Sequence, residues 1–403
     1  MKILMLTNKM PYPPKDGGSI ASLSLALAMQ KCNNEVSILT MNTSKHYFDS
    51  SSIPQDILSR IKIYSVPIDI QIKPFKAIYN LLFSNKPYNA ERFISYEFNK
   101  SLIELISKNH YDIIQLEGLY LAPYIETIRK HSKAKIALRS HNIEHEIWER
   151  TAVNETNPFK KFYKKNLAKR IKKYKLHYLN DYDFLIPITK RDGDIYNSFG
   201  NTRPVHVTET GVDKERYIQR YTDPAYPGFF HIGALDWMPN QEGLIWFFDN
   251  VWSEFTKKYP KTKFYIAGRN APQNFIKYIS SYNNIEYLGE INDANDFIDS
   301  KSVMVVPLLS GSGMRIKIIE GMALGKTIIT TTIGTEGINT TNGENILIAD
   351  TPEDFCKYLE DIYNNKELHS KISNNARDFV NKYYNNYNIA AGLVDFYKKN
   401  IDK

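Results

Sequence analysis

The residues best suited to chemistry in this chain follow an apolar run at 303–309 that predicts a buried parallel strand. A loop of small residues comes next, consisting of Ser310, Gly311, Ser312 and Gly313, and a short helix is expected to begin near Met314. Such a loop lets backbone N–H groups approach a phosphate at a helix N-terminus. The predicted helix carries Arg315, Lys317 and Glu320, and residues 313, 317 and 320 share one of its faces. Two cations suit a diphosphate and a carboxylate suits ribose hydroxyls, so this segment predicts a nucleotide site.

The same segment has a plainer interpretation. Lys317 and Glu320 have the spacing of an i,i+3 ion pair on an exposed helix, which stabilises a helix by about 0.2–0.5 kcal/mol. A Gly-rich loop before a helix is by itself a weak signal. From these residues alone, both interpretations stay open.

A second loop with possible chemistry lies near the N-terminus. Residues 2–7 predict a buried strand, and a Pro-rich loop then ends in Gly17 and Gly18. Ser19 is a good N-cap for an apolar helix at 20–31, and a second strand is expected at 36–40. This strand–helix–strand opening is typical of a doubly wound sheet, which binds ligands at the carboxyl ends of its strands. The glycine pair either approaches such a ligand or only makes the turn.

His141 follows a predicted strand at 135–139, at the edge where a ligand would lie. His141 and His145 have the i,i+4 spacing of metal ligands, but position 149 is Glu149, so the HExxH order is absent and a metal site is not expected. Two Asp-x-Asp tripeptides, at 181–183 and 192–194, border predicted element ends and are attributed to chance. His141 is then either a ligand-contacting residue or a structural histidine with its hydrogen bonds satisfied.

The string from Gly311 to Ile338 resembles the donor-site segment of GT-B glycosyltransferases of family 4. In that family two Glu stand eight positions apart; Glu320 matches the second, whereas the first would fall on Ser312. Most members also carry an Arg and a Lys in the loop that corresponds to 233–240, and this chain has neither there. We therefore expect Arg315 and Lys317 to replace that diphosphate clamp.

The resemblance implies an α/β fold of the GT-B type, with two Rossmann-like domains facing each other across a cleft. It also implies a retaining transfer from a nucleoside-diphosphate sugar, with no metal and no further cofactor. Arg315 and Lys317 would stabilise the leaving diphosphate, and Glu320 would hold the donor ribose. His141 would reach the transferred sugar or the phosphate. Donor-binding backbone is expected at Gly17, Gly18, Gly233, Gly311, Ser312, Gly313 and Met314.

The expected domain organisation is discontinuous. An acceptor-side domain is expected at 1–213, a linker at 214–227 and a donor domain at 228–386, while a last helix at 387–403 crosses back to the first domain. A length of 403 residues suits two domains. Residues 67–90 are expected to be less regular than the rest of the first domain and are rich in aromatic residues and Lys.

Composition predicts a soluble cytoplasmic protein. The chain has two cysteines, no Cys/His zinc spacing, no recognisable signal peptide and no 18-residue apolar segment. The net charge of +8 arises from Lys+Arg 52 against Asp+Glu 44. This balance favours anionic partners, and the distribution of charge must decide between them.

Much of the positive charge falls on one predicted helix at 159–179. It has nine basic residues and no acidic residue, with an apolar stripe expected to pack on the first domain. The helix either exposes a solvated basic face or docks electrostatically on anionic lipid headgroups. Nucleic acid is not expected as a partner, because no stacking or recognition motif accompanies the charge.

Three other functions remain to be weighed against glycosyl transfer to a glycan, lipid-linked or other acceptor. A nucleotide-sugar epimerase uses the same fold, and a catalytically degenerate nucleotide-sugar-binding protein would lack the first Glu and the usual clamp. A dinucleotide dehydrogenase is less favoured, because no GxGxxG follows a predicted strand. Turnover of a nucleotide sugar with and without an acceptor separates these functions.

Overall fold

The computed structural model describes residues 1–402 except residues 15, 45–46, 72–73, 85, 154, 214, 216, 218–223, 283 and 312. The chain forms two compact units, and each is treated by itself. Unit 1 consists of Met1–Gly211 and Asn386–Lys403, and unit 2 of Val212–Asn385. The unit boundaries lie within two residues of positions 213 and 387. Most of the linker expected at 214–227 lies outside the described residues.

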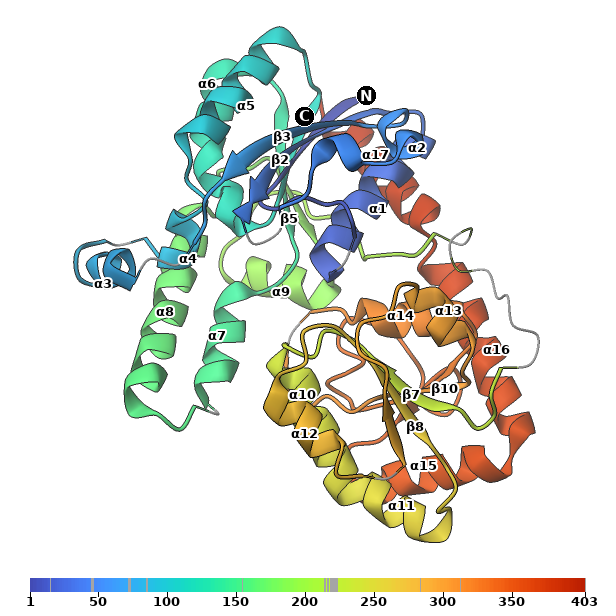
Figure 1. The fold of residues 1–403 in the computed structure, drawn as a ribbon. Helices are drawn as coiled ribbons and strands as arrows, with labels where there is room; N and C mark the ends of the chain where they lie inside the picture. Colours follow the sequence, from blue (N-terminus) through green and yellow to red (C-terminus); the bar gives the residue numbers. More distant parts are fainter. Residues whose placement is uncertain are drawn as a thin grey trace. The chain divides into compact units, whose positions relative to one another are not determined.

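Unit 1 is a parallel sheet covered by helices on both faces (Figure 1). Its strands are β1 Lys2–Thr7, β2 Glu35–Thr43, β3 Lys62–Ile68, β4 Ile113–Glu117, β5 Lys135–Ser140 and β6 Phe184–Pro187. Its α-helices are α1 Gly17–Lys31, α2 Gln55–Leu58, α3 Pro74–Phe83, α4 Tyr88–Glu91, α5 Tyr96–Lys108, α6 Ile125–His131, α7 Glu144–Val153, α8 Pro158–His177, α9 Lys190–Ser198 and α17 Asn386–Asn400.

The strand order of unit 1 is β3-β2-β1-β4-β5-β6, and every pair is parallel. Because side chains alternate along a strand, Ile113 of β4 packs on α1 and α17, while Ile114 packs on the opposite side with α5 and α6. The order reverses between β1 and β4, whose register pairs Thr7 with Glu117. Doubly wound sheets bind ligands at the carboxyl ends of strands at such a switch point.

Unit 2 repeats this architecture. Its strands are β7 Phe229–Ile232, β8 Phe264–Ala267, β9 Ile285–Tyr287, β10 Val303–Val306, β11 Thr327–Thr330 and β12 Leu347–Ile348. Its α-helices are α10 Met238–Phe247, α11 Ser253–Lys258, α12 Gln273–Ile279, α13 Ala294–Asp299, α14 Ile316–Ala323, α15 Pro352–Asn364 and α16 Lys366–Tyr383. The parallel order is β12-β11-β10-β7-β8-β9, so the switch point lies between β7 and β10.

Three local expectations differ in detail from the structure. Asp16, rather than Ser19, caps α1, because its carboxylate accepts from the Ser19 N–H at 3.0 Å. The helix expected near Met314 begins at Ile316, which places Gly313, Met314 and Arg315 ahead of its first turn. The stretch 67–90, expected to be less regular, contains the helix α3 and most of the short helix α4.

None of the helices in the described part of the chain combines the length and the apolar character that a membrane span requires.

Candidate functional site

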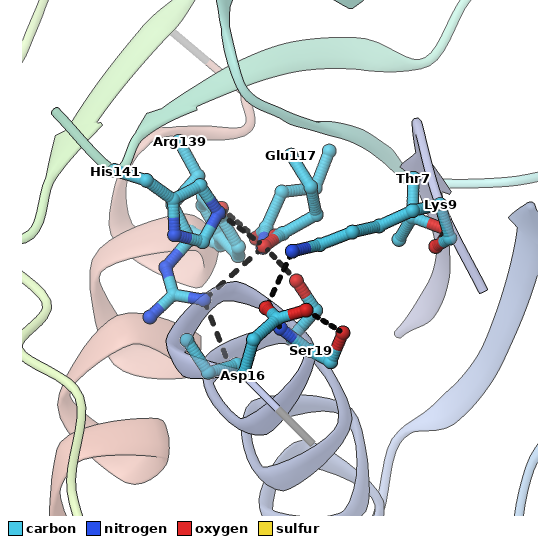
Figure 2. A network of polar contacts seen from close by, with 11 residues as sticks. Thr7, Lys9, Asp16, Ser19, Glu117, Arg139 and His141 are labelled. Carbon is cyan, nitrogen blue, oxygen red and sulfur yellow. Dashed lines mark hydrogen bonds and ion pairs between the residues drawn. The ribbon is translucent and has the colours of Figure 1, made fainter. Parts of the chain in front are cut away.

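The carboxylate of Glu117 organises the switch point of unit 1 (Figure 2). It stands at the end of β4 and is buried, and its Oε2 accepts from Ser22 Oγ at 2.7 Å and from Arg139 Nη1 at 3.2 Å. Gln115 donates to its other oxygen. Burial raises the pKa of Glu117, but Arg139, His141 and Gln115 outweigh burial and bring the pKa to about 2. The carboxylate is therefore charged throughout the physiological range.

His141 lies directly after β5 and is held by this carboxylate. Its Nε2 is 2.8 Å from Oε2 of Glu117, and 18% of the side chain is exposed. Glu117 thereby holds the Nε2 edge of the imidazole while part of the ring stays accessible. His145, one turn later, is buried beside Phe199, and burial together with Lys175 lowers its pKa to about 4. The two histidines thus have separate surroundings.

The N-terminal glycine pair lies at the start of α1. Gly17 is exposed as the first residue of the helix, and Gly18 is half-buried. Lys9, from the loop after β1, pairs with the capping Asp16 and lies against Gly18, where an added Cβ would stand 3.1 Å from the Lys9 Nζ. A cation and the first turn of a helix are therefore adjacent.

Some of these residues line a cavity of about 240 Å³ within unit 1. Its walls include Lys9, Gly18, Glu117, His141 and Glu144. Two carboxylates, one ammonium and one imidazole in so small a space suit the hydroxyl groups of a sugar, which both donate and accept hydrogen bonds.

The carboxylate of Glu144, which lines the cavity, is held by a buried lysine. Lys175 of α8 is fully buried and lies 2.9 Å from the Glu144 Oε2, and its ammonium stands over the ring of Tyr196 at 4.4 Å. Burial lowers the pKa of Lys175, but Glu144 and Tyr196 outweigh this and raise it. One of the nine basic residues of α8 thus supports the cavity instead of facing solvent.

Lys317 occupies the switch point of unit 2. It lies in the first turn of α14, and its ammonium donates to Asn240 Oδ1 at 2.8 Å and to His231 Nε2 at 3.2 Å. The other ring nitrogen of His231 donates to the Val305 carbonyl of the neighbouring strand at 2.8 Å, which fixes the tautomer. A Cβ at Gly233 would stand 3.2 Å from the Lys317 Nζ, so a larger residue at this position would crowd the ammonium.

Electrostatics make Lys317 unusual. Burial and the nearby Arg315 guanidinium lower its pKa to about 7. Burial and Lys317 hold the pKa of His231 well below its ordinary value, so that ring is neutral. An anion bound here would relieve the repulsion between the two cations.

The loop ahead of α14 surrounds Arg315. This guanidinium donates to the Gly313 carbonyl and lies 5.8 Å from the centre of the Trp237 ring. Gly311 and Gly313 take φ angles of 123° and 81°, a region in which glycine is favoured. Met314 packs against the apolar core under α14, and Ser312 lies outside the described residues.

Glu320, one turn after Lys317, is half-buried, and its Oε1 accepts from the Tyr217 hydroxyl at 2.6 Å. The ammonium of Lys317 bonds to Asn240 and His231 rather than to Glu320, so the i,i+3 surface pair is not what the structure shows.

The predicted residues therefore form two groups. Lys317, Arg315, Gly233 and Glu320 belong to unit 2, and His141 with the glycine pair belongs to unit 1. The sequence analysis missed the residues that hold them: Lys9, Glu117, Glu144, Tyr217, His231 and Asn240. Glu117 alone left a local signal, a carboxylate at the end of the apolar strand β4 and before Gly118.

Comparison with known proteins finds similar sequences and a similar fold. Residues 226–365 match the family model of glycosyl transferases group 1. An uncharacterised 44.6 kDa protein in the cps region of Klebsiella pneumoniae is 24% identical over 97% of this chain and 98% of its own length.

Solved structures agree with the fold. Sucrose-phosphate synthase from Thermosynechococcus elongatus superposes with a TM-score of 0.71 at 15% identity, covering 99% of both chains. HepE of Anabaena, solved in complex with UDP, superposes with a TM-score of 0.68 at 12% identity, covering 99% of this chain and 100% of HepE. These likenesses show that the chain has the GT-B fold, and its residues 226–365 match the family of glycosyl transferases group 1.

Proposed function

We propose that the protein transfers a sugar, with retention of configuration, from a nucleoside-diphosphate sugar to a glycan, lipid-linked or other acceptor. The observation that carries this proposal is the ammonium of Lys317 at the unit 2 switch point. Two of its three N–H groups bind Asn240 and His231, and within the described part of the chain the third has no protein partner. A partly buried ammonium whose third N–H group can still donate a hydrogen bond suits a diphosphate oxygen.

The donor is proposed to lie along the start of α14. Lys317 and Arg315 neutralise the diphosphate, backbone N–H groups of Gly311, Gly313 and Met314 contact its oxygens, and Glu320 binds the ribose. The HepE structures that hold UDP or UDP-glucose support a nucleotide sugar as the donor class.

The proposed chemistry is the departure of the nucleoside diphosphate. Cations placed where negative charge develops stabilise the transition state more than the ground state. Arg315 and Lys317 supply these cations, and His141 contacts the transferred sugar or the leaving phosphate, aided by Gly17 and Gly18. Glu117 is occupied by Arg139 and His141, so it is not offered as a covalent nucleophile. We propose a front-face transfer that uses no metal and no other cofactor.

The acceptor is proposed to belong to surface polysaccharide or glycoconjugate synthesis. The Klebsiella relative is named for a cps region, which supports this class. We place the enzyme in the cytoplasm, where a lipid-linked acceptor is met at an anionic membrane through residues 159–179. No nucleic-acid partner is proposed.

Turnover of UDP-sugars by the purified protein, with and without an acceptor mixture, tests the proposal. We expect transfer only with an acceptor, at a rate unchanged by excess EDTA. Free epimer without acceptor would identify an epimerase, and tight binding without turnover would identify a binding protein. A large EDTA loss that Mg²⁺ or Mn²⁺ restores would refute the metal-free mechanism.

Two variants test the donor position. Glu320→Ala and Arg315→Ala each remove a charge-assisted contact of roughly 1.5–3 kcal/mol, so donor use should fall about ten- to a hundred-fold. Glu290→Ala, a carboxylate in the loop after β9, is the matched control. Wild-type turnover in both folded variants would place the donor elsewhere.

A further inference from the structure

The free end of the helical hairpin formed by α7 and α8 exposes apolar side chains. Val153 ends α7 and is 69% exposed, while Phe159 and Phe162 in the first turns of α8 are 85% and 69% exposed. We call these three residues the hairpin tip. The apolar stripe of α8 was expected to be buried against the first domain. This is right for Leu167 and Ile171, which are buried, and wrong for Phe159, which is exposed.

Beyond the hairpin tip, the exposed surface of α8 is formed largely by lysines. Phe162, Lys165, Lys169 and Lys173 are spaced by three or four residues, so they lie along one helical face, and all are exposed. Lys160 is exposed beside Phe159. No acidic residue lies between Asn157 and Asn180 to neutralise this face.

A second aromatic surface lies beside α8 within unit 1. Phe75, Tyr79 and Phe83 of α3 are 87%, 66% and 72% exposed, and their i,i+4,i+8 spacing places them on one face. Arg170 of α8 fixes this segment by donating to the carbonyls of Asn80 and Lys86 at 3.0 and 2.8 Å, and also to that of Ser84. Figure 1 shows α3 projecting next to α8. The aromatic face is thus tied to the basic helix.

We propose that the hairpin tip and the α3 face insert into the headgroup region of an anionic lipid bilayer, with the lysines of α8 on its phosphates. Lysine attracts an anionic surface over about a Debye length, and aromatic rings are stabilised at the membrane interface. A nucleic-acid partner would account for the lysines but leave Phe159 and Phe75 in water. This inference rests on the proposed function only in making the acceptor lipid-linked.

The combination has a measurable signature. Electrostatic attachment alone disappears at high salt, whereas burial of exposed aromatic rings does not depend on screening. We therefore expect two components of binding: one that requires anionic lipid and low salt, and one that persists at high salt once the rings have inserted.

Co-sedimentation with phosphatidylglycerol/phosphatidylethanolamine vesicles tests this inference, with phosphatidylcholine vesicles for comparison. Wild type should bind the anionic vesicles at low salt and retain a bound fraction at high salt. Phe159→Ser with Phe162→Ser should remove the salt-resistant fraction. Lys165→Gln, Lys169→Gln and Lys173→Gln together should weaken low-salt binding on the order of a hundred-fold. Tyr96→Ser, an equally exposed aromatic residue on α5, should change nothing.

Insertion itself is measured with Phe159→Trp, whose fluorescence brominated lipids should quench; the exposed Tyr96→Trp should not be quenched. Binding of RNA or of an acidic protein in place of vesicles, or full release at high salt, would overturn the inference. UDP binding by the same variants should equal wild type. Loss of membrane binding is therefore distinguishable from failure of the proposed function.

Discussion

At the scale of single residues, Lys317 is the side chain whose charge depends most on its surroundings. Burial and Arg315 hold its pKa at about 7, so near neutral pH the free protein holds it partly uncharged. A bound diphosphate favours the charged form and raises this pKa. Binding should therefore take up a proton above pH 7, and UDP affinity should fall as the pH rises further.

Calorimetry of UDP binding at pH 8, in buffers of different ionisation enthalpy, counts that proton. Wild type should show uptake and Lys317→Met should show none, with weaker binding. Lys277→Met on α12 serves as the exposed control. Equal proton uptake in Lys317→Met would assign the proton to another group.

His141 supports a different prediction, because Glu117 holds the ring while part of it remains exposed. If His141 acts on the transferred sugar or the leaving phosphate, His141→Ala should lower kcat by about a hundred-fold and leave UDP affinity within a few-fold of wild type. Steady-state kinetics and UDP titration measure the two quantities. The exposed His110→Ala is the control. Equal losses in both quantities, or a large fall in Tm, would make His141 structural.

The residues that sequence could predict were those with a local pattern. Arg315, Lys317 and Glu320 follow a glycine loop, and His141 follows an apolar strand. Their partners could not be predicted, because His231 lies 86 positions from Lys317 and meets it only when β7 and β10 become neighbours. The depressed pKa of Lys317 likewise depends on burial that spacing does not reveal.

At the scale of elements, the C-terminal helix α17 reaches the site through hydrogen bonds. Tyr397 is buried and donates to Gln115 Oε1 at 2.7 Å; Gln115 donates to Glu117, which holds His141. Tyr397→Phe removes the first donor and leaves a buried amide oxygen unpaired, a loss of about 1–3 kcal/mol.

We therefore expect Tyr397→Phe to lower kcat several-fold and the Tm by a few degrees, with UDP affinity unchanged. The matched control is Tyr387→Phe, half exposed on the same helix. A wild-type kcat in a destabilised Tyr397→Phe protein would show that the hydrogen-bond chain supports only the fold.

The strands were the most predictable elements, because buried parallel strands are continuous apolar runs such as 303–306. Helix starts were less predictable. At α1, Asp16 and Ser19 are both suitable N-cap residues. Asp16 is the cap in the structure, where it also pairs with Lys9, a contact that the sequence alone does not reveal. The two-residue strand β12 is too short to give a periodic signal.

At the scale of the whole molecule, both units place their polar residues at the switch point of the same strand order. The chain completes unit 1 last, because α17 follows all of unit 2. Leu393 of α17 is fully buried with Ala390 and Val394 against the sheet.

Leu393→Ala should therefore destabilise unit 1 by about 2–5 kcal/mol, the usual range for a buried Leu→Ala cavity. Unit 2 keeps its own core, so the loss should be confined to one unit. Hydrogen exchange should show faster amide exchange in β4 and unchanged exchange in β10. Leu359→Ala, equally buried in α15 of unit 2, should give the reverse pattern. Equal loss of protection in both units for either variant would show that the units unfold as one cooperative body, and the division at residues 211 and 385 would then have no energetic meaning.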